Sequence, residues 1–334
     1  MSATQTDIAK LINRVRDDGF VVFHDFLPKP LVAKARQEVA ELFAQDLQER
    51  QAKGEVSPHY KGGAGHSILT SPTHLLLDLY GKSPSLDQLV EIILTNDVSR
   101  KVMSAVAGPH IKFRGYNCTR MTGEYNPPPS AGPAPAVHDW HRDSFCEIGL
   151  GIFLDPFDSP DSGTTSLIRG SHRFPYCPRW NCLFGPPYPR ESILRFTVFN
   201  RLLARKVLKD ATGAYGKPGD FYLFLNDTWH GRQANLHGNK GLRIMIGAFP
   251  ADIPYPDRVP PLAPEVISKL PPALAKVVPH REEPPNPAAT EIPETLNGTV
   301  LKDTVEARQE PLFPGLFFMA RGERRLADRL ISSK

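Results

Sequence analysis

The chain has 334 residues, 40% of them hydrophobic and 23% charged, so it is long enough and apolar enough to bury a sizeable core. Lysine and arginine exceed aspartate and glutamate by only 40 to 36, and a net charge of +4 without a dense basic run argues against nucleic acid as a partner. The sequence shows no secretory leader, no apolar run that would span a bilayer, and no zinc-type spacing among its four cysteines. We therefore expect a cytoplasmic protein without nucleic-acid or membrane partners.

The first hundred residues predict helices around one short strand. Residues 5–18 place apolar side chains at helical spacing, and residues 20–23 are β-branched or aromatic, as in a buried strand. An amphipathic helix follows over 31–48, and two more helices over 84–106. Between them, the glycine-rich segment 53–66 is expected to be a flexible loop, with a mobile lid as the alternative.

From residue 110 onwards, the pattern changes to short apolar strands separated by turns. The expected strands cover 111–121, 144–154, 164–168, 193–199, 220–225 and 242–249, with a stiff proline-rich loop at 127–135. Several antiparallel strands after a helical region predict a mainly β protein with N-terminal helices, folded as a jelly roll.

The C-terminal part has a different composition. Residues 250–293 are dense in proline and lack periodicity, and a closing helix is expected over 321–331. The predicted organisation is therefore a domain over 1–250, with its jelly-roll core at about 110–250, and a proline-rich extension over 251–334 that packs on the core or extends from it.

The segment around residue 140 carries the strongest chemical signal. On a strand, side chains repeat every second residue, so His141 and Asp143 point the same way. An imidazole and a carboxylate side by side are two of the three ligands of a facial triad, the arrangement that holds non-haem iron(II). The neighbouring pair His138 and Asp139 does not fit, because adjacent side chains face opposite ways.

A second histidine far downstream is needed to complete such a triad. His230 follows the apolar run 220–225 and is the preferred third ligand; its rival, His237, lies in a turn rich in glycine and asparagine. Arg243 comes 13 residues after His230, within a predicted strand. A guanidinium that points into an apolar pocket needs an anionic partner, and the distal carboxylate of 2-oxoglutarate fits; an ordinary surface salt bridge is the alternative.

Five segments resemble, in one order, the phytanoyl-CoA dioxygenase family of iron(II)/2-oxoglutarate-dependent oxygenases. They are 18–27, the Trp-His-Arg-Asp of 140–143, Leu154-Asp155 with 162–173, 219–230, and Arg243. The resemblance covers roughly residues 15–250 and implies a double-stranded β-helix of the cupin-like kind. It also implies that His141, Asp143 and His230 bind iron(II), that Arg243 holds 2-oxoglutarate, and that O2 is the oxidant.

The chain departs from the family pattern at several positions. Arg169 replaces a proline, and Arg232 stands where many relatives carry a small hydroxyl residue that contacts the cosubstrate. Arg232 is therefore a candidate cosubstrate contact, with a substrate or a surface carboxylate as its alternative partner. Asn117 and Thr119 share one face of a predicted strand, and Asn117 is a further candidate cosubstrate contact, with an ordinary polar residue of the sheet as the alternative.

The implied activity is oxidation of an unactivated C–H bond, most simply hydroxylation, in a small metabolite or natural-product intermediate, with release of succinate and CO2. Related halogenases carry glycine or alanine where this chain has Asp143, so the carboxylate favours hydroxylation; desaturation, ring formation and rearrangement are alternatives. Two other classes stay open: a non-oxidative, cupin-like metal enzyme, and a catalytically silent binding protein. The sequence does not indicate the substrate or the oligomeric state.

Overall fold

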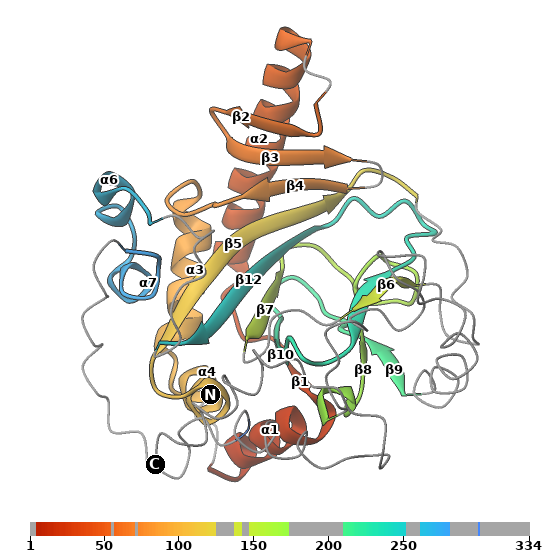
Figure 1. The fold of residues 1–334 in the computed structure, drawn as a ribbon, viewed down its shortest axis with the longest axis vertical. Helices are drawn as coiled ribbons and strands as arrows, with labels where there is room; N and C mark the ends of the chain where they lie inside the picture. The colour runs from red at the N-terminus through yellow and green to blue at the C-terminus, as the bar shows by residue number, and fades with distance from the viewer. Residues whose placement is uncertain are drawn as a thin grey trace, which may run out of the picture.

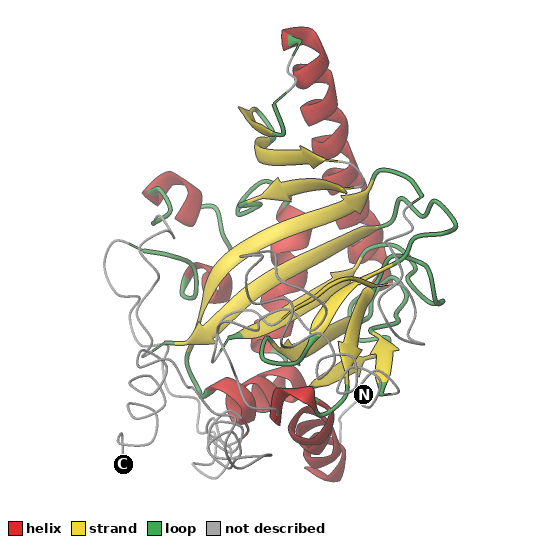
Figure 2. Cartoon of the chain, turned by 45° about the vertical axis from the view of Figure 1, so that its right-hand side comes forward, coloured by secondary structure: helices red, strands yellow, loops and turns green. Residues whose placement is uncertain are grey.

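A computed structural model describes residues 5–54, 57–70, 73–124, 137–141, 147–173, 210–251, 261–280 and residue 300. Asp143 lies outside these residues, as do the predicted elements at 127–135, 193–199 and 321–331. The described chain forms two antiparallel sheets, with helices against the larger one (Figures 1 and 2). None of the helices among the described residues is long and apolar enough to cross a bilayer.

The N-terminal half supplies the helical layer, as the sequence predicted. Its helices are α1 (Gln5–Asp18), α2 (Lys29–Lys53), α3 (Pro84–Thr95) and α4 (Asp97–Ala107). The division of 84–107 into two helices has a local cause: Asn96 leaves helical geometry, and its side chain accepts a hydrogen bond from the backbone N–H of Val98 at 2.9 Å, which caps α4. Glu38 of α2 fixes the start of α3 by accepting from the hydroxyls of Ser83 and Ser85, at 2.7 Å each.

The larger sheet has eight strands, and its order brings distant segments together. In spatial order they are β1 (Phe20–Phe23), β10 (Phe221–Leu225), β7 (Ile148–Phe153), β12 (Leu242–Pro250), β5 (Ile111–Met121), β4 (Thr73–Leu77), β3 (Gly65–Thr70) and β2 (His59–Gly62). One face packs on the helices, and along β10 the side chains of Phe221, Leu223 and Leu225 belong to that core. The alternate residues Tyr222 and Phe224 face the second sheet.

The smaller sheet completes a double-stranded β-helix, so the predicted jelly roll is confirmed. Its order is β6 (Val137–His141), β11 (His230–Gln233), β8 (Thr165–Ile168) and β9 (Ala211–Gly213). Phe153, Phe157, Leu167, Tyr222 and Phe224 form the apolar core between the two sheets. The space between the sheets is therefore lined by aromatic side chains as well as by the polar groups described below.

The prediction of a flexible loop over 53–66 was wrong, because most of this segment belongs to a hairpin. β2 and β3 pair across a turn at Gly63 and Ala64, and β4 joins them to β5 beside α2 (Figure 1). A buried network holds the hairpin onto α2: Asp46 accepts from Arg50 at 2.9 Å, from Ser67 at 2.6 Å and from His74 at 2.8 Å. Because these partners come from three elements, the local sequence gave little sign of them.

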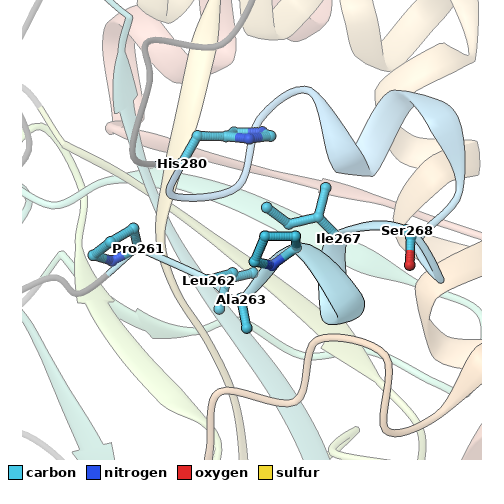
Figure 3. A pocket seen from close by; sticks show the side chains of 7 residues that line it. Pro261, Leu262, Ala263, Ile267, Ser268 and His280 are labelled. Carbon is cyan, nitrogen blue, oxygen red and sulfur yellow. The ribbon is translucent and has the colours of Figure 1, made fainter.

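The described part of the C-terminal extension packs on the helical side. Short helices α6 (Pro264–Ile267) and α7 (Pro272–Ala275) place Leu274 and Val278 in the same core as α3, and Val300 is buried there too. Figure 3 shows a pocket at α6, and the described residues that line it all belong to this extension. The predicted boundary near residue 250 stays a prediction.

Candidate functional site

The start of β11 places His230 inside the barrel. Its backbone pairs with that of His141 on β6, so the two histidines that the sequence singled out occupy facing positions on neighbouring strands. The imidazole of His230 is buried, at 6% exposure, and lies against the ring of Phe224 with centroids 5.0 Å apart. Its Nδ1 donates to the carbonyl of Thr228 at 2.8 Å. This bond fixes the tautomer in which Nε2 carries the lone pair that a metal needs.

Two of the predicted ligands are only partly described. The structure gives the backbone of His141, whereas Asp143 lies two residues beyond the end of β6, outside the described residues. The rival histidine, His237, is exposed in the turn between β11 and β12 and has no strand partner in β6. The triad of His141, Asp143 and His230 stays a prediction, and the facing register of the two histidines supports it.

The loop before His230 is held in place by residues near the N-terminus and by residues of the 162–173 segment. Gly19, with φ at +85°, sits so close to the loop before His230 that a Cβ there would lie 2.3 Å from Oγ1 of Thr228 and 2.6 Å from Nδ1 of His172. Thr228 donates to the carbonyl of Gly19 at 3.1 Å. The hydroxyl of Ser171 accepts from the backbone N–H of Trp229 at 2.8 Å. These contacts therefore fix the loop that precedes His230, and Nε2 of His172 donates to the carbonyl of Arg16 at 2.9 Å.

Two aspartates in the segments that resemble the family, Asp155 and Asp220, fix the positions of other strands. Asp220, just before β10, accepts from the backbone N–H groups of Asp25 at 2.8 Å and Lys217 at 3.0 Å. Asp155 accepts from the backbone N–H of Leu242 at 2.9 Å and thereby fixes the start of β12, one residue before Arg243. Both carboxylates act on backbone positions rather than on reacting atoms.

Arg243 is a buried cation between the two sheets, with 7% exposure. Its Nη1 donates to the hydroxyl of Thr165 on β8 at 2.8 Å, and its guanidinium carbon lies 5.8 Å from the ring centroid of Phe157. Among the described residues, its Nε has no hydrogen-bond partner and no carboxylate lies within salt-bridge distance. The alternative of a surface salt bridge is therefore wrong. A buried guanidinium without a counter-ion is costly, so this position is suited to a bound organic acid.

Two residues that the sequence analysis did not single out support Arg243. The hydroxyl of Thr165 lies 3.0 Å from the phenol oxygen of Tyr222, which in turn lies 3.1 Å from the sulfur of Met245. Gly151 on β7 makes space for this arrangement, since a Cβ there would lie 2.1 Å from the ring of Tyr222. The alternation of side chains along 220–225 could have indicated that Tyr222 points away from the helices. Its contact with Thr165 could not be predicted, because it requires the two sheets to face each other.

The other candidate cosubstrate contacts have protein partners in the structure. Asn117 lies on the barrel face of β5 beside Met245, and its Oδ1 accepts from the backbone N–H of Asp78 at 3.2 Å. Arg232 pairs with Thr165 in the β11–β8 register, and its guanidinium donates to the hydroxyl of Thr73. Both assignments stay predictions.

Two further residues lie on the other face of the sheet. Arg120 lies over the ring of Phe43 on α2, at 5.9 Å, so it faces the helices rather than the barrel. Burial raises the pKa of the Cys118 thiol far above its ordinary value, so Cys118 acts as a small buried hydrophobe. The other three cysteines lie outside the described residues.

Comparison with known families decides the broader assignment. The profile of the phytanoyl-CoA dioxygenase (PhyH) family matches residues 15–240, which is more than half of the chain and includes every predicted metal ligand. The chain belongs to this family. Its members are iron(II)- and 2-oxoglutarate-dependent oxygenases, so the predictions of family, enzyme class and cofactors are confirmed.

Solved structures give weak but extensive matches. AviO1 from Streptomyces viridochromogenes Tue57 is 18% identical, with 78% of this chain and 100% of that chain covered and a TM-score of 0.44. HygX from Streptomyces hygroscopicus, solved with nickel and 2-oxoglutarate, is 15% identical over 75% and 89% of the two chains, with a TM-score of 0.44. The carbocyclase SnoK from nogalamycin biosynthesis is 15% identical over 76% and 87%, with a TM-score of 0.46. No curated protein sequence matches the chain.

Proposed function

We propose that this oxygenase hydroxylates an unactivated C–H bond of a small metabolite or natural-product intermediate, with release of succinate and CO2. The observation that carries the proposal is Arg243, a cation buried between the sheets without a carboxylate partner among the described residues. It shares this interior with His230, whose tautomer suits a metal ligand. A site that held a metal without an organic acid would leave the charge of Arg243 uncompensated.

The residues present fit the cofactors of the family. His141, Asp143 and His230 would hold iron(II), and Arg243 with Thr165 would hold the distal carboxylate of 2-oxoglutarate. When bound, iron(II) and 2-oxoglutarate supply the activation of O2 and the oxidising power that side chains lack.

The protein itself contributes orientation and the exclusion of water. Thr165 fixes one edge of the Arg243 guanidinium and is held by the phenol of Tyr222. The rings of Phe153, Phe157 and Tyr222 enclose this end of the barrel and are all nearly inaccessible to solvent. A dry surrounding strengthens the pairing of the guanidinium with a carboxylate. At the other side, the Thr228 carbonyl orients His230.

The kind of oxidation is inferred from the presence of a carboxylate at position 143. A carboxylate ligand occupies the place that a halide takes in related halogenases, and this favours hydroxylation. Two neighbours of this fold have names that point to other outcomes, an epimerase and a carbocyclase of nogalamycin biosynthesis, so rearrangement and ring formation stay the alternatives. The cytoplasmic location also stays a prediction.

An anaerobic titration tests the proposal directly. Iron(II) and 2-oxoglutarate added together should give the weak visible absorption band of the chelated acid in the parent chain. His230→Ala should abolish the band, and Arg243→Gln should require much more 2-oxoglutarate to reach it. The control is His237→Ala, which alters the exposed rival histidine and should leave the titration unchanged. Absence of the band in the parent, or an unchanged band in His230→Ala, would contradict the proposal.

A further inference from the structure

Met245 places a thioether on the inner face of the large sheet. Its neighbours on β12, Ile244 and Ile246, belong to the core under the helices, so Met245 and Arg243 point the other way, between the two sheets. Met245 packs there against the apolar core between the sheets and stays partly exposed, whereas Arg243 is buried. The thioether therefore borders accessible space on the face that carries Arg243.

A chain of hydrogen bonds links the sulfur of Met245 to Arg243. Nη1 of Arg243 donates to the hydroxyl of Thr165 at 2.8 Å, and that hydroxyl lies 3.0 Å from the phenol oxygen of Tyr222. The phenol in turn donates to the sulfur of Met245 at 3.1 Å. The sulfur is therefore close to the group that would hold the distal carboxylate of 2-oxoglutarate.

The strand register puts Met245 between Arg243 and His230 along the barrel. Met245 and Tyr222 pair with the same residue of β7 and so share one row of the sheet. Two residues further along β10, the ring of Phe224 lies against that of His230, with centroids 5.0 Å apart. Arg243 lies two residues from Met245 in the opposite direction, and each such step covers about 7 Å of strand. Met245 is therefore flanked by the predicted cosubstrate end and by a predicted metal ligand.

The thioether is the group in this part of the barrel that accepts an oxygen atom most readily. Its sulfur forms a sulfoxide through a lone pair, without the breaking of a C–H bond. The rings of Tyr222 and Phe224 are at most 2% exposed, whereas Met245 is partly exposed. Among the described residues, the other methionines, Met103 and Met121, are at most 4% exposed. Met245 is therefore the described methionine best placed to meet an oxidant formed inside the barrel.

We propose that Met245 is a site of self-oxidation, at which the enzyme converts its own thioether to the sulfoxide when no organic substrate is bound. The reactants are those of the family: 2-oxoglutarate, O2 and the thioether give succinate, CO2 and methionine sulfoxide. One oxygen atom of O2 enters succinate, and the other forms the S–O bond. Oxidation of 2-oxoglutarate supplies half of the electrons that O2 takes up, and the sulfur supplies the other half. This inference rests on the proposed function, because it uses the same metal and cosubstrate.

Peptide mapping by mass spectrometry tests the proposal on the protein itself. The protein is incubated with iron(II), 2-oxoglutarate and O2, and catalase is added to remove free peroxide. Parallel samples lack iron(II), 2-oxoglutarate or O2. Met245 should gain one oxygen atom in the complete mixture and keep its mass in every incomplete one, while Met103 and Met121 in the same digest stay unmodified. Oxidation of the three methionines alike, or oxidation of Met245 without 2-oxoglutarate, overturns the proposal.

Two variants then assign the oxygen to this place in the barrel. Met245→Leu has a similar volume but no sulfur, so the peptide that contains this position should gain no oxygen. At the 2-oxoglutarate concentration that half-saturates the parent, Arg243→Gln should slow Met245 oxidation at least about fivefold, because losing a hydrogen bond to a charged group weakens binding about tenfold to a hundredfold.

The matched control for Arg243→Gln is Arg100→Gln on α4, whose guanidinium pairs with Asp97 at 3.2 Å. Met245 should be oxidised in this control at the rate of the parent. Equal rates in Arg243→Gln and the parent, or a gain of oxygen in the Met245→Leu peptide, would overturn the proposal. If Arg243→Gln fails to fold, the parent sample without 2-oxoglutarate decides.

The anaerobic visible band separates this inference from the proposed function. If the parent gives no band, the proposed function is wrong. If the band forms and Met245 keeps its mass after O2 is admitted, the inference alone is wrong. A gain of oxygen at Tyr222 in place of Met245 overturns it as well. A band followed by oxidation of Met245 that needs all three reactants supports both.

Discussion

Asp87 provides a stability prediction whose size follows from its surroundings. Its carboxyl group lies in the first turn of α3, 1% exposed, next to the phenol of Tyr116. Burial raises its pKa from 3.8 to about 7, although the backbone N–H of Gly81 donates to it at 3.1 Å. The unfolded chain holds the same carboxyl group in water, where its pKa is ordinary.

The sign of the pH effect follows from this raised pKa. Between pH 3.8 and about 7 the folded protein keeps the proton that the unfolded chain releases, so the contribution of Asp87 to stability falls as the pH rises. Above pH 7 the whole contribution of Asp87 to the free energy of unfolding is lost. A shift of about three pKa units corresponds to about 4 kcal/mol. Asp87→Asn carries no charge at any pH, so it should be close to the parent in stability near pH 4 and more stable by up to about 4 kcal/mol at pH 8.

Urea unfolding at pH 4 to 8 measures this difference, provided that both proteins unfold in one reversible transition. The control is Asp97→Asn on α4, whose carboxyl group is exposed and has its pKa lowered by Lys101 and Arg100. That variant should lose a little stability at neutral pH instead of gaining it. Parallel pH profiles for the parent and Asp87→Asn would refute the reasoning, because they would mean that the carboxyl group is ionised in the folded protein.

Three further predictions concern the barrel and its support. Arg243→Gln should raise the KM for 2-oxoglutarate at least about tenfold, because a charged bidentate contact is lost, and steady-state succinate formation measures it; an unchanged KM would remove Arg243 from the cosubstrate site. In thermal unfolding, Gly151→Ala should destabilise the fold by about 1–3 kcal/mol, because the added Cβ would collide with the ring of Tyr222. The control Gly123→Ala, whose Cβ would meet no atom within 4 Å, should be nearly neutral. Equal melting temperatures for the two variants would contradict the close packing at Gly151. Asp46→Ala should cost about 3–5 kcal/mol in urea unfolding, because it leaves Arg50 buried without its carboxylate, and a loss below 1 kcal/mol would show that the network is not needed.

Much of the fold was predictable because it depends on short-range patterns. The helices over 5–18 and 84–107 and the strands β5, β10 and β12 follow from apolar periodicity, glycine and capping residues. The hairpin of β2 and β3 was missed because its strands are short and polar, and their stability comes from Asp46 and Arg50 on α2. A pattern of nearby residues contains no information about such a distant partner.

In the candidate site, too, some residues could be predicted from the sequence and others depend on distant parts of the chain. His230 and Arg243 were predicted from motif order, and both lie between the two sheets. Thr165 and Tyr222 were missed, since their roles depend on β8 and β10 facing each other across the barrel.

The sequence by itself determined the family, the order of the motifs and the residue types able to hold iron(II) and an organic acid, because these depend on side-chain chemistry and local spacing. Only the tertiary structure decided that the backbone of His230 pairs with that of His141, and that Arg243 is buried without a carboxylate among the described residues. These facts depend on pairing between strands far apart in the chain. A register shift of one residue moves a side chain to the opposite face of a sheet, and local sequence does not fix that register.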